Sequence, residues 1–408
     1  MIHIVGGSYL EHCLEPSWRQ LFGSGGRGAA ALSELSNKTQ LTTYIGKSEL
    51  SNIEIVAANF NIALNAIETD RTISFDYYHP LSEPSIHPPV SLIKKSSPLT
   101  IAGDNILRYG FIDGDAIVNG KKVVYDPQNT YKPELFNKNG STAENLVIVA
   151  NIGESIKLTG KRYQQEHPEK IGHTLLEAEN AEAVVIKRGS LGATVVTASE
   201  TRNVPAFQTS RVWSIGSGDV FAAVLAHFWA EKGLDVFNAA ELASLATALY
   251  CDTKTLPIPG NFVSNKLQYP PVERNNDLPF TVKQAYLAGP FFTMAERWII
   301  DQSRRYLSEQ GFKVFSPLHD VGHGPAQIVA PADIKGLEES DVVFAILDKL
   351  DAGTLFEVGY ARSLNKPVIV FVQNESLENL KMVEGTGCEI VGDFVTAIYK
   401  TVWAAMKL

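Results

Sequence analysis

Cysteine is scarce in this chain, with three residues among 408, namely Cys13, Cys251 and Cys388. Three thiols so far apart in the sequence are too few for a disulfide framework or for a cysteine-based zinc site. We therefore expect buried, reduced thiols and no structural metal.

Long hydrophobic runs and an excess of basic residues are also lacking. No stretch approaches the roughly 20 consecutive apolar residues of a membrane-spanning helix, and the N-terminus does not combine a basic region with a long apolar run. The formal net charge of -9 argues against general nucleic-acid binding. These absences predict a cytoplasmic protein that binds neither nucleic acid nor a membrane.

The length and the order of elements are the positive signals. A chain of 408 residues exceeds the size at which one hydrophobic core usually keeps growing, so two domains are expected. Short apolar runs such as 145–150, 183–186 and 193–196 alternate with helical patterns, which predicts parallel or mixed α/β sheets.

A stretch rich in proline, glycine and asparagine at residues 253–277 is the best candidate for a boundary between domains. We predict a first domain at 1–265, a linker at 266–281 and a second domain at 282–408.

Local patterns in the first domain predict further elements. Strands are expected at 1–5, 41–46, 73–79, 90–94 and 123–127, helices at 29–35 and 53–67, and a loop at 80–89. The segment 16–22 lacks β alternation, so the glycines of Gly23–Gly28 do not directly follow a strand as a dinucleotide-binding fingerprint requires. They are better explained as a close approach of the backbone to a small ligand at a helix start.

Two later groups carry the residue types of phosphoryl transfer. Gly216-Ser-Gly-Asp219 precedes an apolar helix, and Asn151-Ile-Gly-Glu154 follows a predicted strand. Glycine amides at a helix N-terminus can stabilise charge on a transferred phosphoryl group, and an adjacent carboxylate can accept the proton of an attacking hydroxyl.

Together with Gly25-Gly26, these groups resemble the ribokinase-like (PfkB) family of sugar and nucleoside kinases over about residues 1–265. The resemblance implies a ribokinase-like doubly wound α/β domain that uses ATP and Mg²⁺. The roles it implies are sugar contact for Gly25 and Gly26, metal and phosphate binding for Asn151 and Glu154, an anion hole at Gly216, Ser217 and Gly218, and a catalytic base at Asp219.

Two positions depart from the family pattern. Trp213 stands where the family usually has an aspartate associated with a monovalent cation, and Ala30 stands where an asparagine usually helps to hold the sugar. The segment before the glycine pair is short, which predicts a reduced β lid. Two interpretations stay open: an active kinase, or a kinase-shaped domain that binds a nucleoside or serves assembly.

The second domain shows a regular order of elements. Strands are expected at 284–288, 312–315, 341–347 and 367–372, with helices at 291–310, 331–339 and 354–365. Glu357 lies in the first turn of the last helix, beyond the carboxyl end of a strand, where ligands bind in open α/β sheets. Thr354-x-x-Glu357 is also a capping-box pattern, in which the glutamate only accepts the N-cap amide. The local pattern supports both interpretations.

Four groups in this domain resemble the nucleoside 2-deoxyribosyltransferase family, namely Tyr286–Phe292, Ser316-Pro317, Asp333–Asp341 and Asp351–Ala361. The resemblance implies a smaller, flavodoxin- or Rossmann-like doubly wound α/β domain that forms homo-oligomers. Glu357 would be the nucleophile that attacks C1′ of a deoxyribose, and Tyr286 would position it.

The resemblance also implies roles around the nucleophile. Asp333 and Asp351 would bind the departing base and help manage its proton. The implied substrate contacts are Gly289, Pro290, Phe291, Gly353 and, from near the C-terminus and often from a neighbouring subunit, Asn379.

These residue types suit cleavage of an N-glycosidic bond. The reaction passes through an oxocarbenium-like state, which a carboxylate below the ring stabilises, first electrostatically and then as a covalent ester. Neighbouring acids raise the pKa of at least one carboxyl, which can then share a proton with the base. A nucleoside and a free base are the expected partners, and glycosyl transfer needs no cofactor.

Several alternatives stay open. Transfer to a second base and hydrolysis share this machinery, and the first domain would phosphorylate a nucleoside or a released sugar if the two domains are coupled. The loop 288–292 lacks the serines and arginines of a phosphate-binding turn, which favours nucleosides over nucleotides.

His319 and His323 lie among Gly and Pro residues that favour a loop, so we expect substrate lining rather than a metal there.

Overall fold

The computed structural model describes residues 1–128, 132–161, 167–273 and 283–408. Its contacts divide the chain into unit 1 (Met1–Thr209 and Trp213–Pro271) and unit 2 (Ser210–Val212 and Val272–Leu408). The break after Pro271 falls within the predicted linker, whose residues 274–281 lie outside the described residues. The two domain ranges stay a prediction, and each unit is described by itself.

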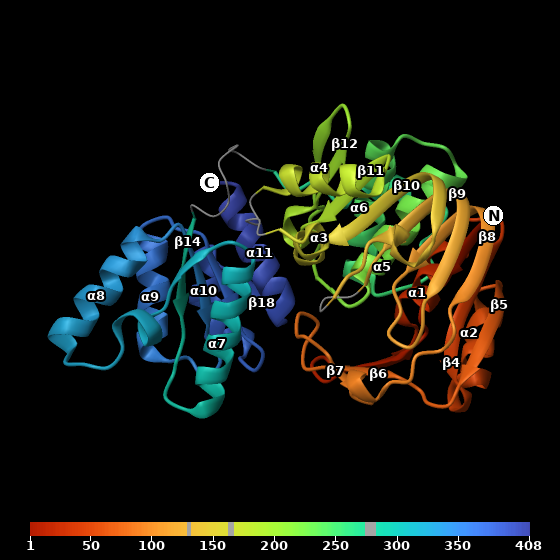
Figure 1. Ribbon diagram of the computed structural model, residues 1–408. Coiled ribbons are helices and arrows are strands. Elements are labelled where there is room, and N and C mark those ends of the chain that lie inside the picture. Colours follow the sequence, from red (N-terminus) through yellow and green to blue (C-terminus); the bar gives the residue numbers. More distant parts are fainter. Residues whose placement is uncertain (129–131, 162–166, 274–282) are drawn as a thin grey trace. The chain divides into compact units, whose positions relative to one another are not determined.

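A nine-stranded sheet runs through the described part of unit 1 (Figure 1). Its strands, in spatial order, are β13 (Thr201–Val204), β12 (Ala193–Thr197), β11 (Ala183–Lys187), β10 (Thr142–Asn151), β9 (Ala116–Asp126), β8 (Leu99–Tyr109), β1 (Ile2–Val5), β4 (Thr39–Gly46) and β5 (Ile62–Thr69). The pairs from β11 to β5 are parallel, whereas β12 pairs antiparallel with both β11 and β13.

Helices cover both faces of this sheet, because successive strand side chains point to opposite sides. Leu107 and Val147 belong to one buried cluster, and their neighbours Ile106 and Ile148 belong to another. The first cluster includes residues of α1 (Gly23–Leu32), α5 (Ser217–Ala226) and α6 (Val236–Thr253), and the second includes residues of α3 (Ile152–Thr159) and α4 (Pro168–Glu179). The predicted doubly wound α/β architecture is therefore present.

A separate four-stranded sheet forms from β3 (Trp18–Leu21), β2 (Leu10–Cys13), β6 (Ser74–Tyr77) and β7 (Ser85–His87). β2 and β3 pair antiparallel, so the segment expected to lack β character contributes a strand. The expected loop at 80–89 likewise contains β7.

Three further element predictions in unit 1 are wrong. The helix expected at 53–67 is α2 (Leu50–Asn59) followed by β5, because Asn61 takes a left-handed conformation (φ 51°) that ends the helix. The strand expected at 90–94 is a 3₁₀ turn at Val90–Leu92. The helix expected at 29–35 begins at Gly23, so the glycine cluster lies inside α1.

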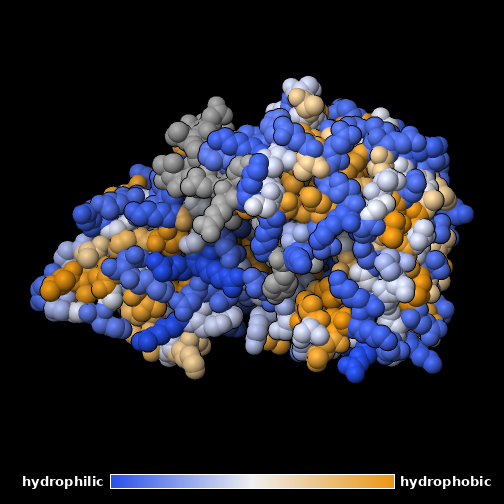
Figure 2. All heavy atoms as spheres, viewed as in Figure 1, coloured by the Kyte–Doolittle hydropathy of each residue, from blue (hydrophilic) through white to orange (hydrophobic). Residues whose placement is uncertain are grey.

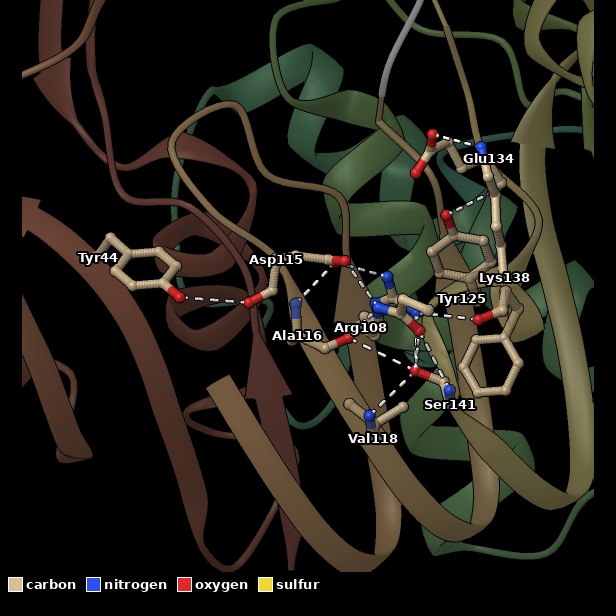
Figure 3. A network of polar contacts seen from close by, with 11 residues as sticks. Tyr44, Arg108, Asp115, Ala116, Val118, Tyr125, Glu134, Lys138 and Ser141 are labelled. Atoms are coloured by element: carbon tan, nitrogen blue, oxygen red, sulfur yellow. Dashed lines mark hydrogen bonds and ion pairs between the residues drawn. The ribbon is translucent and has the colours of Figure 1, made fainter. Parts of the chain in front are cut away.

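A polar network near the carboxyl half of β8 is centred on the buried Arg108 (Figure 3). Its guanidinium donates to Oδ1 of Asp115 at 2.8 Å and to Oγ of Ser141 at 3.1 Å, and it lies over the ring of Tyr125. Ser141 also accepts the backbone amide of Val118. The charge of Arg108 is therefore balanced inside unit 1, and this network holds β8, β9 and the start of β10 together.

The described part of unit 2 is built on a five-stranded, fully parallel sheet. In spatial order its strands are β15 (Lys313–Phe315), β14 (Gln284–Ala288), β16 (Val342–Ile346), β17 (Val368–Phe371) and β18 (Glu389–Val391). The three-residue β18 was not predicted. Numbered along the chain, this order is 2-1-3-4-5, the flavodoxin-like arrangement, whose ligand site lies where the strand order reverses, between β14 and β16.

Helices flank this sheet in two layers (Figure 1). The layer that packs against the Tyr286 face comprises α8 (Ala326–Glu339), α9 (Ala352–Ser363) and α10 (Leu377–Gly385), and the remaining helices are α7 (Met294–Glu309) and α11 (Phe394–Met406). α7 begins later than the predicted 291, because the side chain of Thr293 caps it together with Glu296. α8 begins earlier than 331 and continues through Pro331.

Candidate active sites

Glu357 and Tyr286 meet at the point where the strand order of unit 2 reverses. Tyr286 lies on β14 and is fully buried, and Glu357 lies on α9, which follows β16. The Tyr286 hydroxyl donates to Oε1 of Glu357 at 2.6 Å. One carboxylate oxygen of Glu357 is thus held by the protein.

The capping-box interpretation of Glu357 is wrong. The N-cap of α9 is Asp351, whose Oδ2 accepts the backbone amide of Thr354 at 2.8 Å and its hydroxyl at 2.9 Å. Glu357 therefore lies in the second turn of the helix and not in the first, and the partner of its carboxylate is a tyrosine rather than an amide. Asp351 itself takes the N-cap role that the sequence pattern assigns to Thr354.

Asp333 supplies the third acid of this region. It lies on α8, and its Oδ1 is buried without a hydrogen-bond partner among the described residues. Burial raises the pKa of Asp333. Burial also raises the pKa of Glu357 to about 7, an effect that the hydrogen bond from Tyr286 opposes and the nearby charges of Asp333 and Asp351 increase. The site can therefore hold one ionised and one protonated carboxyl near neutral pH.

The predicted substrate contacts occupy two loops and two helices. Gly289, Pro290 and Phe291 connect β14 to α7, and a Cβ at Gly289 would lie 2.9 Å from Cδ1 of Ile300 and 3.2 Å from Cβ of Ile346, so a side chain there would crowd both. Gly353 is the second residue of α9. Asn379 is exposed on α10 and donates to Glu375 rather than to one of these acids.

The residues after β15 form a π-helical turn at Pro317–Val321 rather than an open loop. His319 contacts Asp301 at 2.8 Å and Ser316 at 3.1 Å. The ring of His323 meets that of Phe291, with centroids 5.8 Å apart. His323, but not His319, therefore lies against the loop predicted to line the substrate.

In unit 1, Asp219 is engaged by a residue that the sequence did not single out. Arg27 donates from Nη1 to Oδ2 of Asp219 at 2.9 Å and binds both carboxylate oxygens of Glu11, at 3.2 and 2.6 Å. All three side chains are buried. Burial raises the pKa of Asp219 to about 6, against the opposing effect of Arg27. The expected base is thus already paired with a cation.

The predicted anion hole lies at the start of α5. Gly216 is the N-cap with φ 75°, and a Cβ there would lie 2.1 Å from Nε of Arg27, so glycine is required on both grounds. Ser217 and Gly218 follow in the first turn, and Nζ of Lys187 lies 3.2 Å from where a Cβ of Gly218 would be. Lys187 also pairs with the buried Asp126. A helix N-terminus with an adjacent ammonium fits a phosphate group.

The other predicted kinase residues have local structural roles. Asn151 and Glu154 form a capping box at the start of α3, with Oδ1 of Asn151 accepting the amide of Glu154 and Oε2 of Glu154 accepting that of Asn151. A Cβ at Gly25 would lie 2.5 Å from the carbonyl oxygen of Gly6, whereas Gly26 has room for one. The residues present fit nucleotide phosphates better than a protein-held Mg²⁺.

The part of the chain that the structure describes contains no group of three His, Cys, Asp or Glu side chains arranged to hold a metal ion. Over the same residues, no helix combines the length and hydrophobicity needed to cross a bilayer. The three cysteines are free and buried, as predicted.

The site residues that sequence reasoning missed are Glu11, Arg27 and Lys187 in unit 1, and Phe315 in unit 2. Arg27 stands inside the glycine cluster, and a charged residue in that position was a usable signal. Phe315 stacks on Tyr286, with ring centroids 5.5 Å apart and an interplanar angle of 16°. No local sequence pattern indicates this contact.

The fold of unit 2 and its cluster of acids at the strand-order reversal define an α/β protein with a small-molecule site. The nucleoside 2-deoxyribosyltransferase family matches residues 285–391, and the pfkB family carbohydrate kinases match residues 131–256. The chain therefore contains a nucleoside 2-deoxyribosyltransferase domain and a PfkB carbohydrate kinase domain, as the sequence resemblances indicate. Both are enzyme families.

Individual similar proteins match this chain at low sequence identity or over only part of its length. An uncharacterised protein of Ureaplasma parvum serovar 3 is 33% identical over 99 residues, which are 20% of this chain and 61% of that protein's length. Among solved structures, ribokinase from Thermotoga maritima is 17% identical with a TM-score of 0.47, over 66% of this chain and 99% of that one. Phosphofructokinase-2 from Escherichia coli in complex with potassium is 13% identical with a TM-score of 0.46, over 65% and 98%.

Proposed function

We propose that unit 2 cleaves or exchanges the N-glycosidic bond of deoxynucleosides through a covalent intermediate on Glu357. The observation that carries this proposal is the 2.6 Å hydrogen bond from Tyr286 to one oxygen of Glu357, beside a second acid with a raised pKa. The hydrogen bond orients the carboxylate and leaves its other oxygen for C1′ of the sugar.

In the first half of the reaction, Oε2 of Glu357 forms a bond to C1′ as the bond from C1′ to the base nitrogen breaks. The electron pair of that bond goes to the base, and Asp333 donates the proton that the departing base takes up. In the second half, a nitrogen of another base, or water, attacks C1′ and releases the Glu357 carboxylate, while Asp333 recovers a proton. Transfer and hydrolysis differ only in the acceptor.

The two flanking acids are assigned different tasks. The Oδ2 atom of Asp351 is occupied by the amide and hydroxyl of Thr354, so Asp351 is best suited to fix the start of α9. Oδ1 of Asp333 has no partner among the described residues and is free to meet the base. We therefore assign the proton transfer to Asp333.

Incubating the protein with a deoxynucleoside, with and without a second free base, tests the proposal. Free base, or an exchanged nucleoside, is expected from the wild type and not from Glu357→Ala. A variant at Tyr360, whose hydroxyl contacts the exposed Glu338 rather than the site, is the matched control. If the wild type releases no base, or if Glu357→Ala stays fully active, the proposal is wrong.

Homo-oligomerisation is also proposed, because unit 2 exposes large hydrophobic side chains. These include Phe292 between β14 and α7, Met294 and Trp298 on α7, Ile328 on α8, Phe356 on α9, and Leu377 and Met382 on α10. Figure 2 shows hydrophobic residues grouped on the surface over α8. Exposed hydrophobic groups of this kind mark association sites, and a second copy of the chain would bring Asn379 to a neighbouring pocket.

A second candidate function is a coupled kinase in unit 1. In its favour, the start of α5 and Lys187 would hold the phosphates of ATP, which would supply the phosphoryl group, and Asp219 would take a proton from the acceptor hydroxyl. Against it, Arg27 already binds Asp219, which favours a module that binds a nucleoside without phosphorylating it. ATP consumption with a panel of nucleosides and sugars, for the wild type and Asp219→Ala, separates the two; no consumption with any acceptor excludes the kinase.

A further inference from the structure

Gly336 occupies a position on α8 where a side chain cannot be placed. It follows Asp333 by three residues, so the two lie on the same helix face, one turn apart. A Cβ at Gly336 would lie 2.3 Å from both Cε1 and Cζ of Phe315. Carbon atoms do not approach one another so closely, so α8 holds its distance from β15 only because residue 336 is glycine.

The ring that fills this space supports Tyr286. Phe315 ends β15, and its ring stacks on that of Tyr286 on the neighbouring strand β14. The Tyr286 hydroxyl in turn donates to Glu357. One line of contacts therefore runs from Gly336 through Phe315 and Tyr286 to Glu357.

The far end of α8 is fastened to the sheet. The side-chain amide of Gln284, at the start of β14, donates to Oγ of Ser340 at 3.0 Å, and this hydroxyl donates to the carbonyl oxygen of Gly336 at 2.8 Å. Because of this attachment, sliding the helix along β14 cannot relieve the clash of an added methyl group at residue 336 with Phe315. The expected response is an outward movement of the half of α8 that carries Asp333.

We propose that Gly336 is a positioning residue for glycosyl transfer: it admits the Phe315 ring, which holds Tyr286 against Glu357, and it lets α8 carry Asp333 to the departing base. This inference rests on the proposed function of unit 2. It assigns a role to a residue that touches neither the substrate nor the nucleophile.

Three variants test the inference: Gly336→Ala, Phe315→Leu and the double variant, with Gly359→Ala as a matched control. Gly359 lies on α9 with no atom within 4 Å of an added Cβ. Exchange of a deoxynucleoside with a second base is measured as kcat and KM across pH. Gly336→Ala is expected to lower kcat by about 10- to 100-fold, as small misplacements of catalytic groups do, with a smaller change in KM. The double variant should regain part of this loss, and Gly359→Ala should match the wild type.

The pH profile distinguishes positioning from simple structural damage. The charge of Asp333 raises the pKa of Glu357, so moving Asp333 away in Gly336→Ala shifts the acid limb of kcat/KM to lower pH. The Tyr286 hydrogen bond lowers the same pKa, so loosening Tyr286 in Phe315→Leu shifts that limb to higher pH. Opposite shifts are expected only if the two residues act through different partners of Glu357.

The outcomes separate this inference from the proposed function. A wild type without exchange activity rejects the proposed function. An active wild type with Gly336→Ala unchanged in kcat and pH profile rejects the positioning role alone. If Gly336→Ala does not fold, Phe315→Leu decides, because an unchanged kcat and pH profile in that variant overturns the inference.

Discussion

The phenol of Tyr286 and the carboxylate of Glu357, 71 residues apart in sequence, are joined by a 2.6 Å hydrogen bond at the reversal of strand order in unit 2. The bond orients one carboxylate oxygen and also opposes the rise in the pKa of Glu357 that burial causes. Orientation and ionisation of the proposed nucleophile thus depend on the same hydroxyl.

Removing that hydroxyl should therefore change both the rate and its pH dependence. For Tyr286→Phe we expect kcat/KM to fall by about 10- to 100-fold, the usual worth of a hydrogen bond to a charged group. Because the wild-type nucleophile must lose a proton with a pKa of about 7, activity falls as the pH drops through that value, and the variant's acid limb should move to higher pH. Tyr360→Phe is the control, and an unshifted profile in Tyr286→Phe would contradict the assignment.

Replacing Glu357 by glutamine should abolish exchange but stabilise the fold at alkaline pH. A carboxyl whose pKa is raised in the folded state stabilises that state fully below its unfolded pKa, and this contribution is lost as the pH rises through about 7. At pH 8 we expect Glu357→Gln to be more stable than the wild type by about 1–2 kcal/mol after allowance for solvent screening, with no difference near pH 4. Urea unfolding at both pH values measures this, with Glu338→Gln as the exposed control; equal stability at pH 8 contradicts it.

Asp351 and Asp333 should respond differently to substitution. Asp351→Ala loses the N-cap of α9 and should cost about 1 kcal/mol of stability, whereas Asp351→Ser keeps a capping oxygen and most of the activity. Asp333→Asn should leave stability nearly unchanged and lower kcat. Thermal unfolding and initial exchange rates distinguish the two residues, and a loss of kcat in Asp351→Ser as large as that in Asp333→Asn would instead give Asp351 a direct chemical role.

Disrupting the buried ion cluster of Arg27, Glu11 and Asp219 should strongly lower the stability of unit 1. Arg27→Met leaves Glu11 and Asp219 buried without a cation, which should cost about 3–5 kcal/mol. Lys121→Met, which breaks the exposed pair with Asp104, is the control and should leave the unfolding midpoint unchanged. Equal midpoints for Arg27→Met and the wild type would show that the buried cluster contributes nothing to stability.

The sequence predicted the α/β class and both families because their signals are local. Val343 and its neighbours form a continuous apolar run, which is typical of a strand buried on both faces. The family motif along α9 is recognised from the spacing of its residues in the sequence. The capping interpretation of Glu357 failed because Thr354 and Asp351 present similar patterns, and only the backbone shows which residue caps the helix. Arg27 and Phe315 were missed because their partners are distant in sequence: Asp219 is 192 residues from Arg27.

The fully parallel sheet of unit 2 also has a kinetic consequence. Tyr286 lies on β14 and Glu357 on α9, the helix that follows β16, and the pairing of β14 with β16 closes a loop that includes all of α7, β15 and α8. Contacts of such long sequence separation form late and slowly, because the entropy of closing the loop is lost before they are made. During refolding, the helices of unit 2 should therefore appear before the nucleophile acquires its hydrogen bond, and catalytic competence would be among the last properties to return.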